Sequence, residues 1–593
     1  DRLGDWGWYG FYNYVSLKPG ASIDALEKKY QTFVNPFVNK SGADRQFTPH
    51  FQPLPAIHLY STAFEYDIAV KGNIIYVRVL MIIIAFILLI ASFNFVNLAI
   101  ARSLQRAKEV GVRKSIGASR FQLIAQFFAE TFILTLVSAL IAFVAACILL
   151  PYLNDFTGKQ ISYAVLLSFP ALFLLILLVL VISVIAGIYP AIVLSGFKPT
   201  RVLKGLLDGP ATKKVFIRQG LVVVQFVLSV LLIISAIVVI RQVNYMHQKE
   251  LGFQKEQLLL FSIPGTDLEE KADAVRQELL QSPFISNVSA AYGFPGDLYG
   301  DGMVTLLKNG ATKKTNLFMV DEAYLKTIGL QLMAGRDFSR TYSLDKNNFI
   351  INETAAKEFG FNKPQEAIGQ TLTWPTWRNS DSLKKGQIVG VVKDFHYKSM
   401  HDKIEPLVLQ IYPPAFSKVA VRIKTDGIPN ALEHIKKVYA TFSPDYPLVY
   451  NFLDERFDSM YSSEDKLSTL ISIFTGITLF IASLGLLGLA AYSAERRRKE
   501  LGIRKILGAS SKLLVLLVSR EFLLLVGIAF IIASPIAYYF MNQWLQEFAY
   551  RILISWWIFL IGGGLTLLVA FITVLSQIMK VTYSNPVRNL RIE

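Results

Sequence analysis

Seven long apolar runs leave few folds open to this chain. They lie at about residues 75–101, 122–150, 166–195, 219–241, 467–493, 513–540 and 553–580. A helix that crosses a bilayer needs about 20 apolar residues, so each run is long enough to span a membrane. Because 53% of the 593 residues are hydrophobic, the sequence predicts an integral membrane protein built on a helical bundle.

The loops between these runs alternate in charge. Lys and Arg gather in the loops 102–121, 196–218 and 494–512. Loops 151–165 and 541–552 carry almost no charge. Since basic loops stay in the cytoplasm, we expect residues 1–73 and 242–466 to lie outside and the C-terminus to be cytoplasmic. This pattern also accounts for the net charge of +16, so we expect no nucleic-acid partner.

One charged segment occurs twice. Residues 106–119 read RAKEVGVRKSIGAS and residues 497–510 read RRKELGIRKILGAS, and nine of the fourteen positions are identical at an offset of 391. Each copy follows one apolar run and leads into the next with the same sidedness, which indicates a parallel duplication. We name residues 106–119 the first elbow and residues 497–510 the second elbow.

Both elbows predict a short amphipathic helix with the same end. Basic residues surround an apolar stripe, an arrangement suited to a membrane surface. Gly117 and Gly508 can end the helix with a positive φ, and Ser119 and Ser510 can cap the helix that follows. Only the first elbow also has a glutamine, Gln122, three residues after its serine, which predicts a capping box there alone.

The duplication divides the chain into five predicted domains. They are the end of a first outer domain (1–73), a first permease domain with three spans (74–205), a linker and a helix (206–245), a second outer domain (246–466) and a second permease domain with three spans (467–593). No counterpart of the run at 219–241 precedes the first permease domain. We therefore expect about 170 or more residues, with one further span, before residue 1.

The second outer domain has mixed α/β patterning. Strand-like runs rich in Val, Ile and Leu lie at 257–264, 386–397, 406–412 and 418–425. Helical spacing marks residues 267–283 and 429–442. The expected fold is therefore a membrane α-helical bundle with extracytoplasmic mixed α/β domains.

Two acids occur inside apolar runs. Glu130 and Glu521 are related by the same offset of 391. Acids within spans are expensive unless they face protein or water, and a proton path usually needs several of them. We therefore favour an ion pair with a basic residue of the elbow over an ion relay.

Other polar and aromatic clusters give weaker signals. Segment 393–405 contains Asp394, His396, His401, Asp402 and Glu405. Their spacing matches no standard metal motif, so we expect a strand and an exposed turn and predict neither a metal site nor a catalytic group. A second cluster is typical of an outer membrane interface; it comprises Trp544, Tyr550, Trp556 and Trp557.

These residues resemble a known family. KEVGVRKSIGAS and KELGIRKILGAS look like the signature of FtsX/MacB-type ABC transporter permeases, and NPVRNLR (585–591) resembles the end of such a permease domain. YLKTIGLQLMAGRDF (324–338) is similar to the MacB periplasmic core domain. The arrangement resembles the duplicated eight-span version typical of Bacteroidetes-like bacteria, with two parallel FtsX-like repeats.

The resemblance implies that each elbow is a coupling helix for a separate cytosolic ABC ATPase, itself a dimer. The implied coupling residues are Lys108, Glu109, Gly111, Arg113, Lys114, Gly117, Lys499, Glu500, Gly502, Arg504, Lys505 and Gly508. ATP and Mg²⁺ would bind to that partner. This chain has no GxxxxGK[ST] motif, so we expect a non-catalytic subunit that holds no cofactor.

The family further implies a multi-pass protein of the bacterial inner membrane, surrounded by lipid. It would couple ATP hydrolysis to export or to periplasmic mechanotransmission, with substrates such as antimicrobial peptides, macrolides or lipoproteins. A periplasmic adaptor or hydrolase is a further expected partner. A regulatory relay that controls an extracytoplasmic hydrolase or sensor without transport remains an alternative, whereas the scarcity of charge within the spans argues against an ion-coupled carrier.

Overall fold

A computed structural model describes residues 12–38, 48–61, 72–105, 112–195, 211–264, 268–297, 300–376 and 383–582. The chain forms two compact units, residues 1–84 and 85–593. The smaller unit contains α1 (Ile23–Val38), η2 (Leu54–Ala56), α2 (Ile57–Tyr60) and the start of α3 (Ile74–Gln105). Within it, the Phe51 amide donates to Glu27 Oε1 at 2.8 Å, and the Phe51 ring packs edge-on against Tyr30.

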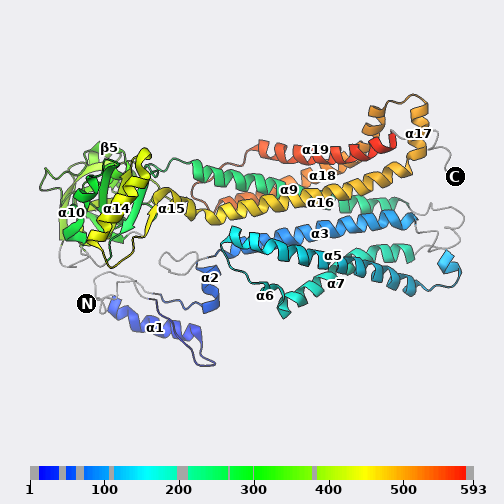
Figure 1. Cartoon of the computed structure of the whole chain (residues 1–593), viewed down its shortest axis with the longest axis horizontal. Coiled ribbons are helices and arrows are strands. Elements are labelled where there is room, and N and C mark those ends of the chain that lie inside the picture. Colours follow the sequence, from blue (N-terminus) through cyan, green and yellow to red (C-terminus); the bar gives the residue numbers. More distant parts are fainter. Residues whose placement is uncertain are drawn as a thin grey trace. The chain divides into compact units, whose positions relative to one another are not determined.

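Helices occupy all seven apolar runs. They are α3, α5 (Arg120–Thr157), α7 (Phe169–Ser195), α9 (Ala211–Gln248), α16 (Ser462–Arg496), α18 (Ser511–Leu545) and α19 (Trp556–Thr582) (Figure 1). Six of them have the length and hydropathy of a membrane span, and the described side chains of α7 form a shorter apolar stretch, Phe169–Ile185. Some helices extend beyond their apolar run: α9 starts before residue 219 and ends after residue 241.

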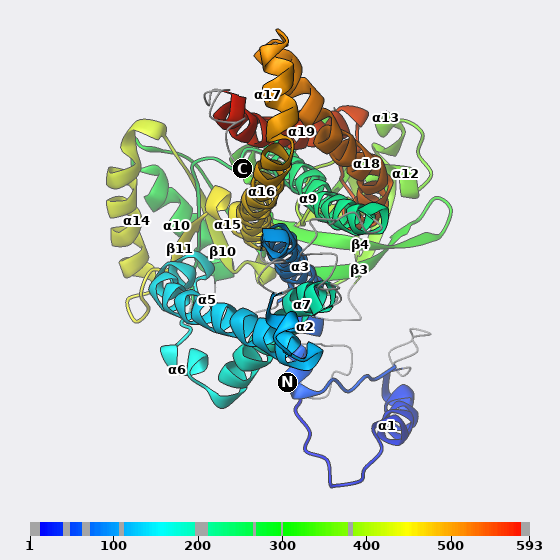
Figure 2. The ribbon, with the colours of Figure 1, turned by 90° about the vertical axis from the view of Figure 1, so that its right-hand side faces the viewer.

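α9 lies at the centre of the second set of helices. It packs against α16, α18 and α19, and α19 in turn packs against both α16 and α18 (Figure 2). Their shared core consists of aliphatic and aromatic side chains from all four helices, including Phe226, Leu486, Val518 and Val574. Of the 18 consecutive residues that form the most apolar part of α9, 61% are buried within the protein. This helix is therefore covered mainly by protein.

α3 meets α16 at equivalent positions of the two repeats. Asn94 Nδ2 donates to the Ile481 carbonyl at 3.3 Å, and a Cβ placed at Gly485 would lie 2.8 Å from Asn94 Oδ1. Positions 94 and 485 differ by the repeat offset of 391. Small residues let helix backbones approach closely within a membrane, so the glycine on α16 makes room for the asparagine on α3.

A mixed α/β domain is inserted between α9 and α16. Its strands are β1 (Leu258–Ser262), β2 (Ile285–Ala291), β3 (Gly300–Leu306), β4 (Ala311–Val320), β5 (Leu332–Gly335), β6 (Phe349–Asn352), β7 (Thr371–Pro375), β8 (Leu383–Val392), β9 (Leu407–Ile411), β10 (Lys418–Ile423) and β11 (Tyr450–Phe452). Its helices are α10 (Leu268–Leu280), α11 (Tyr324–Ile328), α12 (Glu353–Glu358), α13 (Pro364–Ala367), α14 (Ile428–Phe442) and α15 (Leu453–Met460).

The sheet has an open part and a closed part. The strand order is β11-β1-β10-β2-β4-β3-β7-β8-β6-β9, and β9 pairs in parallel with β4, which closes a ring of six strands. The ring encloses a core that includes Trp374, Phe349 and Leu317. The open part, β11-β1-β10-β2, packs against α10 and α14. Ring closure leaves these six strands without a free edge.

The predicted elements of this domain are confirmed where the sequence pattern is strong. Runs 257–264, 406–412 and 418–425 form β1, β9 and β10, and the two helical runs form α10 and α14. Run 386–397 is only partly a strand, because β8 ends at Val392. The other strands were not predicted; several are only 3 to 5 residues long.

Candidate functional site

The second elbow forms a short helix, α17 (Arg498–Ile506), between two spans. Its apolar side chains face outward, with Ile503 51% and Ile506 59% exposed. Arg504 pairs with Glu500 one turn earlier at 2.8 Å, which supports the helix. The elbow therefore presents apolar and cationic side chains together on an accessible surface.

Both elbows end in the same hydrogen-bonded turn. In the first, Ala118 N–H donates to the Arg113 carbonyl at 3.0 Å and Gly117 N–H to the Lys114 carbonyl at 3.1 Å. In the second, Ala509 and Gly508 make the equivalent bonds at 2.9 and 3.1 Å. This pair of bonds is the Schellman motif, which requires a left-handed residue. The predicted positive φ is confirmed: it is 104° at Gly117 and 91° at Gly508.

A serine then caps each following helix, as predicted. Ser119 accepts from Gln122 N–H at 3.3 Å, and the Gln122 side chain accepts from Ser119 N–H at 2.9 Å. These two bonds complete the capping box of α5. Ser510 accepts from Leu513 N–H at 3.4 Å. Turn and cap together leave no flexible linker between the end of each elbow and the next long helix.

The two intramembrane acids link these helices to the elbows. Glu521 on α18 forms an ion pair with Arg497, the residue that joins α16 to α17. Glu130 on α5 accepts from Gln126 at 3.2 Å, and Gln126 in turn accepts from Arg113 at 2.7 Å. The predicted pairing with a basic elbow residue is confirmed for Glu521. For Glu130, Gln126 bridges the acid to the elbow.

The structure places the remaining predicted coupling residues as follows. Lys108, Glu109 and Gly111 lie outside the described residues. Lys499 and Gly502 are part of α17, but the Lys499 side chain is not among those described. The sequence did not single out Arg497 among the basic residues of the second elbow, and Gln126 was missed as a link. The signal for Gln126 was its spacing, because residues four apart share one helix face.

The candidate metal ligands of segment 393–405 contact separate partners. Asp394 accepts from Thr354 N–H and Oγ1 at 3.0 and 2.7 Å, and Glu405 pairs with Lys398 at 2.9 Å. His396 packs against the Tyr550 ring, and His401 packs against Phe548 and lies 3.6 Å from Glu464. Within the described residues there is no group of three or more metal-ligating side chains.

The predicted aromatic belt is only partly supported. Trp556 is 73% exposed, as an interfacial ring would be, whereas Trp544 is only 9% exposed and packs against Phe548. Tyr550 packs against His396 of the α/β domain. Tyr550 and Trp544 thus face protein, because the loop that carries them folds onto that domain.

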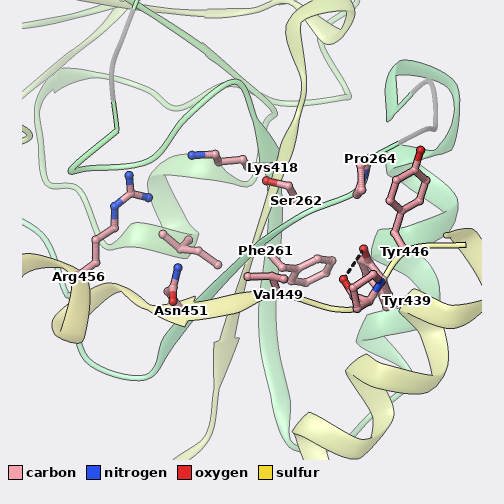
Figure 3. Close-up of a pocket in the computed structure, with 11 residues that line it drawn as sticks. Phe261, Ser262, Pro264, Lys418, Tyr439, Tyr446, Val449, Asn451 and Arg456 are labelled. Atoms are coloured by element: carbon pink, nitrogen blue, oxygen red, sulfur yellow. Dashed lines mark hydrogen bonds between the residues drawn. The ribbon is translucent and has the colours of Figure 1, made fainter. Parts of the chain in front are cut away.

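A cavity of about 340 Å³ opens in the α/β domain beside β1 (Figure 3). Phe261 and Tyr439 contribute apolar wall, and Lys418 and Arg456 also line it. Both cations pair with the buried Asp297. Small-molecule sites span about 300–1,000 Å³, so the cavity has the size of a small site whose accessible wall is mainly apolar.

Comparison with known proteins identifies the repeated region. A family model described as "FtsX-like permease C-terminal" matches residues 81–199 and 472–586. An uncharacterized ABC transporter permease, YknZ of Bacillus subtilis, is 37% identical over 54 residues, which cover 9% of this chain and 14% of that protein. The match therefore spans only a small part of that relative's length.

Two solved structures are similar to part of the chain. The periplasmic region of MacB from Actinobacillus actinomycetemcomitans is 15% identical and covers 36% of this chain and 97% of that chain, with a TM-score of 0.26. The extracellular domain of YknZ from Gram-positive bacteria is 14% identical and covers 33% of this chain and 97% of that chain, with a TM-score of 0.24. Since both scores are low, the fold assignment rests on the helices and strands described above.

Proposed function

We propose that this chain, which matches a model of FtsX-like permease domains at two positions, is the membrane subunit of an ATP-driven complex of the ABC transporter type. In this proposal a separate cytosolic ATPase docks on the two elbows. ATP and Mg²⁺ bind to that ATPase, and this chain supplies the membrane path and the α/β domain on which the motion acts. The protein is then a multi-pass membrane protein with its elbows in the cytoplasm.

The observation that carries the proposal is the shared geometry of the two elbows. Each places an exposed apolar side chain at the equivalent position, Ile116 or Leu507, next to a cationic helix end with the same turn and the same serine cap. Two equivalent docking elements suit a dimeric motor, because a symmetric partner presents the same surface twice. A purely topological role would require the positive charge alone and not the same turn.

The hydrogen bonds and ion pairs explain how a push on an elbow would reach the membrane helices. The second elbow is joined to α18 by the Arg497–Glu521 ion pair and by the Ser510 cap. The first is joined to α5 through Gln126 and the Ser119 capping box. Each elbow and its long helix therefore move as one lever, and the α/β domain lies at the other end of α9 and α16. Export of a substrate and control of an extracytoplasmic partner both use this mechanical step.

A charge reversal at the second elbow tests docking. We expect Arg504→Glu with Lys505→Glu to reduce co-purification of the ATPase at least tenfold, because both cations lie at the end of α17 next to its exposed apolar face. The measurement is affinity purification of the whole chain in detergent, with mass spectrometry to identify an ABC-type ATPase and an assay of ATP hydrolysis.

A charge swap provides the matched control. Glu500→Arg with Arg504→Glu keeps an ion pair between residues four apart, so α17 should still form while its docking pattern is inverted. Loss of ATPase in both variants, with unchanged thermal unfolding, supports docking through charge. If reversals in both elbows together leave the complex intact, the proposal is wrong. If docking is confirmed, ATPase stimulation by added peptides or macrolides separates a transporter, which should respond, from a relay, which should not.

A further inference from the structure

The loop between α18 and α19, residues 546–555, lies against the α/β domain through backbone hydrogen bonds. Ala549 N–H donates to the His401 carbonyl and Tyr550 N–H to the Met400 carbonyl, both at 3.3 Å. Ile404 N–H points to the Tyr550 hydroxyl at 3.4 Å. The partner segment, residues 396–404, links β8 to β9 and so belongs to the closed ring of strands.

Aromatic packing supports the same contact. The His396 ring meets the Tyr550 ring edge-on, with centroids 4.5 Å apart. His401 lies over Phe548 at 4.4 Å, and Phe548 is buried against Trp544 at the end of α18. Two rings from the loop are thus paired with two rings from the domain, in geometries that aromatic groups favour.

A glutamine of α9 holds the loop from the other side. Gln242 Nε2 donates to the Tyr550 carbonyl at 2.9 Å, and Gln242 Oε1 accepts from Ile552 N–H at 2.9 Å. Gln242 is fully buried. A side-chain amide that bonds a donor and an acceptor two residues apart fixes both the position and the direction of the backbone. Gln242 therefore connects α9, the α18–α19 loop and, through Tyr550, the α/β domain.

The first repeat has a different contact at the corresponding place. There, Asn154 closes the loop after α5 on itself: its side chain donates to the Ile161 carbonyl and accepts from Ile161 N–H, both at 3.0 Å. The end of α5 then accepts a hydrogen bond from Lys466 of α16 at 3.0 Å. This loop is tied to a helix, whereas the second is tied to the α/β domain.

We propose that Gln242 and Tyr550 form a joint that makes the α/β domain follow α18 and α19 when the second elbow is pushed. This inference rests on the proposed function and adds the residues that carry the motion out of the bundle. Without the joint, the domain is held to the bundle by its chain connections to α9 and α16, by His401 against Glu464 of α16 at 3.6 Å and by the Met400 N–H bond to Tyr461 just before α16. With the joint, movement of α17 and α18 is also transmitted to the segment between β8 and β9.

The test follows one distance in the complete complex. Spin labels are attached to the native Cys147 on α5 and to Lys437→Cys on α14, an exposed position. Their separation is measured by pulsed electron paramagnetic resonance, with the ATPase bound, before and after addition of ATP and vanadate. In Gln242→Ala we expect the ATP-dependent change in distance to fall to less than half, with ATP hydrolysis within twofold of the unsubstituted protein.

Matched variants separate the joint from general damage. Gln248→Ala removes an exposed glutamine from the same helix and should keep the full change in distance. Tyr550→Phe retains the ring against His396 and should also keep the change in distance. Tyr550→Ala should lose the change, and it tests the joint independently if Gln242→Ala does not fold.

Two results would overturn the inference, and they differ. If the unsubstituted complex shows an ATP-dependent change and both Gln242→Ala and Tyr550→Ala show the same change, the joint does not carry the motion, while the proposed function stands. If the unsubstituted complex shows no change, the proposed function fails and the joint with it.

Discussion

In the second repeat, α18 packs against α9, and 33% of its most apolar 18-residue stretch is buried. In the first repeat, the corresponding stretch of α5 is only 6% buried. Yet the elbows that lead into these two helices share the same turn and the same serine cap. The difference shows which features are local. Each turn is closed by hydrogen bonds between residues three and five positions apart, so it needs only its own sequence. Burial of a long helix depends on the helices beside it.

The acids of the two repeats serve the same purpose. Glu130 and Glu521 occupy equivalent positions, and Glu521 forms an ion pair with Arg497 at the start of the second elbow. At the first elbow, Gln126 accepts a hydrogen bond from Arg113 and donates one to Glu130. Both acids therefore attach an elbow to the helix that follows it.

The contact between the repeats gives the largest predicted effect. A Cβ at Gly488 on α16 would lie 2.2 Å from Leu98 Cδ2 on α3. We expect Gly488→Leu to lower the free energy of unfolding by about 2 to 3 kcal/mol, as overpacking does. Thermal unfolding in detergent measures this.

Gly476 on the same helix is the control, since a Cβ there would meet no atom within 4 Å. Gly476→Leu should change the stability little. Equal melting temperatures for the two variants would show that α3 and α16 do not pack closely, and the repeats would then be independent bundles.

The joint of the second repeat should respond to acid. Burial, and then the nearby Lys249, lower the pKa of His396 to about 4, below its usual value near 6.5. Between those values the unfolded chain binds a proton that the folded chain does not, so stability falls as the pH drops. Between pH 7 and pH 5 we expect this histidine to lower the free energy of unfolding by about 1 to 2 kcal/mol.

His396→Phe removes the titrating group and keeps a ring against Tyr550. Its unfolding temperature should therefore vary less between pH 7 and pH 5 than that of the unsubstituted protein. The Asn154 closure of the first repeat does not titrate, so Asn154→Ala should leave the pH dependence as it was. Parallel pH curves for the unsubstituted protein and His396→Phe would contradict the assignment.

The acids give the smallest predicted difference. Glu521→Gln replaces a charged partner of Arg497 that is 48% exposed, so we expect a loss of about 0.5 kcal/mol. Glu130→Gln can keep the hydrogen bond that the acid accepts from Gln126, so we expect the first elbow to be held about as firmly as before. Amide hydrogen exchange at residues 503–509 and 113–118 reports how firmly each elbow is held. If exchange becomes faster at the first elbow in Glu130→Gln but not at the second elbow in Glu521→Gln, the expected order of the two effects is wrong.

Much of the architecture could be predicted from the sequence, because its signals are local or periodic. The apolar runs located the long helices, and the repeat located both elbows with their glycine turns and serine caps. Strands such as β5 and β11, four and three residues long, were missed because they carry too little pattern to recognise. The longer strands β2, β3 and β4 were missed as well. The ring closed by β4 and β9 depends on a pairing between residues far apart in the sequence.

The sequence by itself determined the membrane helices and the turns and caps that end both elbows, because each depends on residues within a few positions of one another. It also determined the duplication, because two local patterns match at an offset of 391. Only the tertiary structure decided that Arg497 pairs with Glu521, that α9 is the central helix, and that Tyr550 lies between Gln242 and His396. These contacts join segments up to about three hundred residues apart, and no local pattern records which distant surface a polar or aromatic side chain will meet.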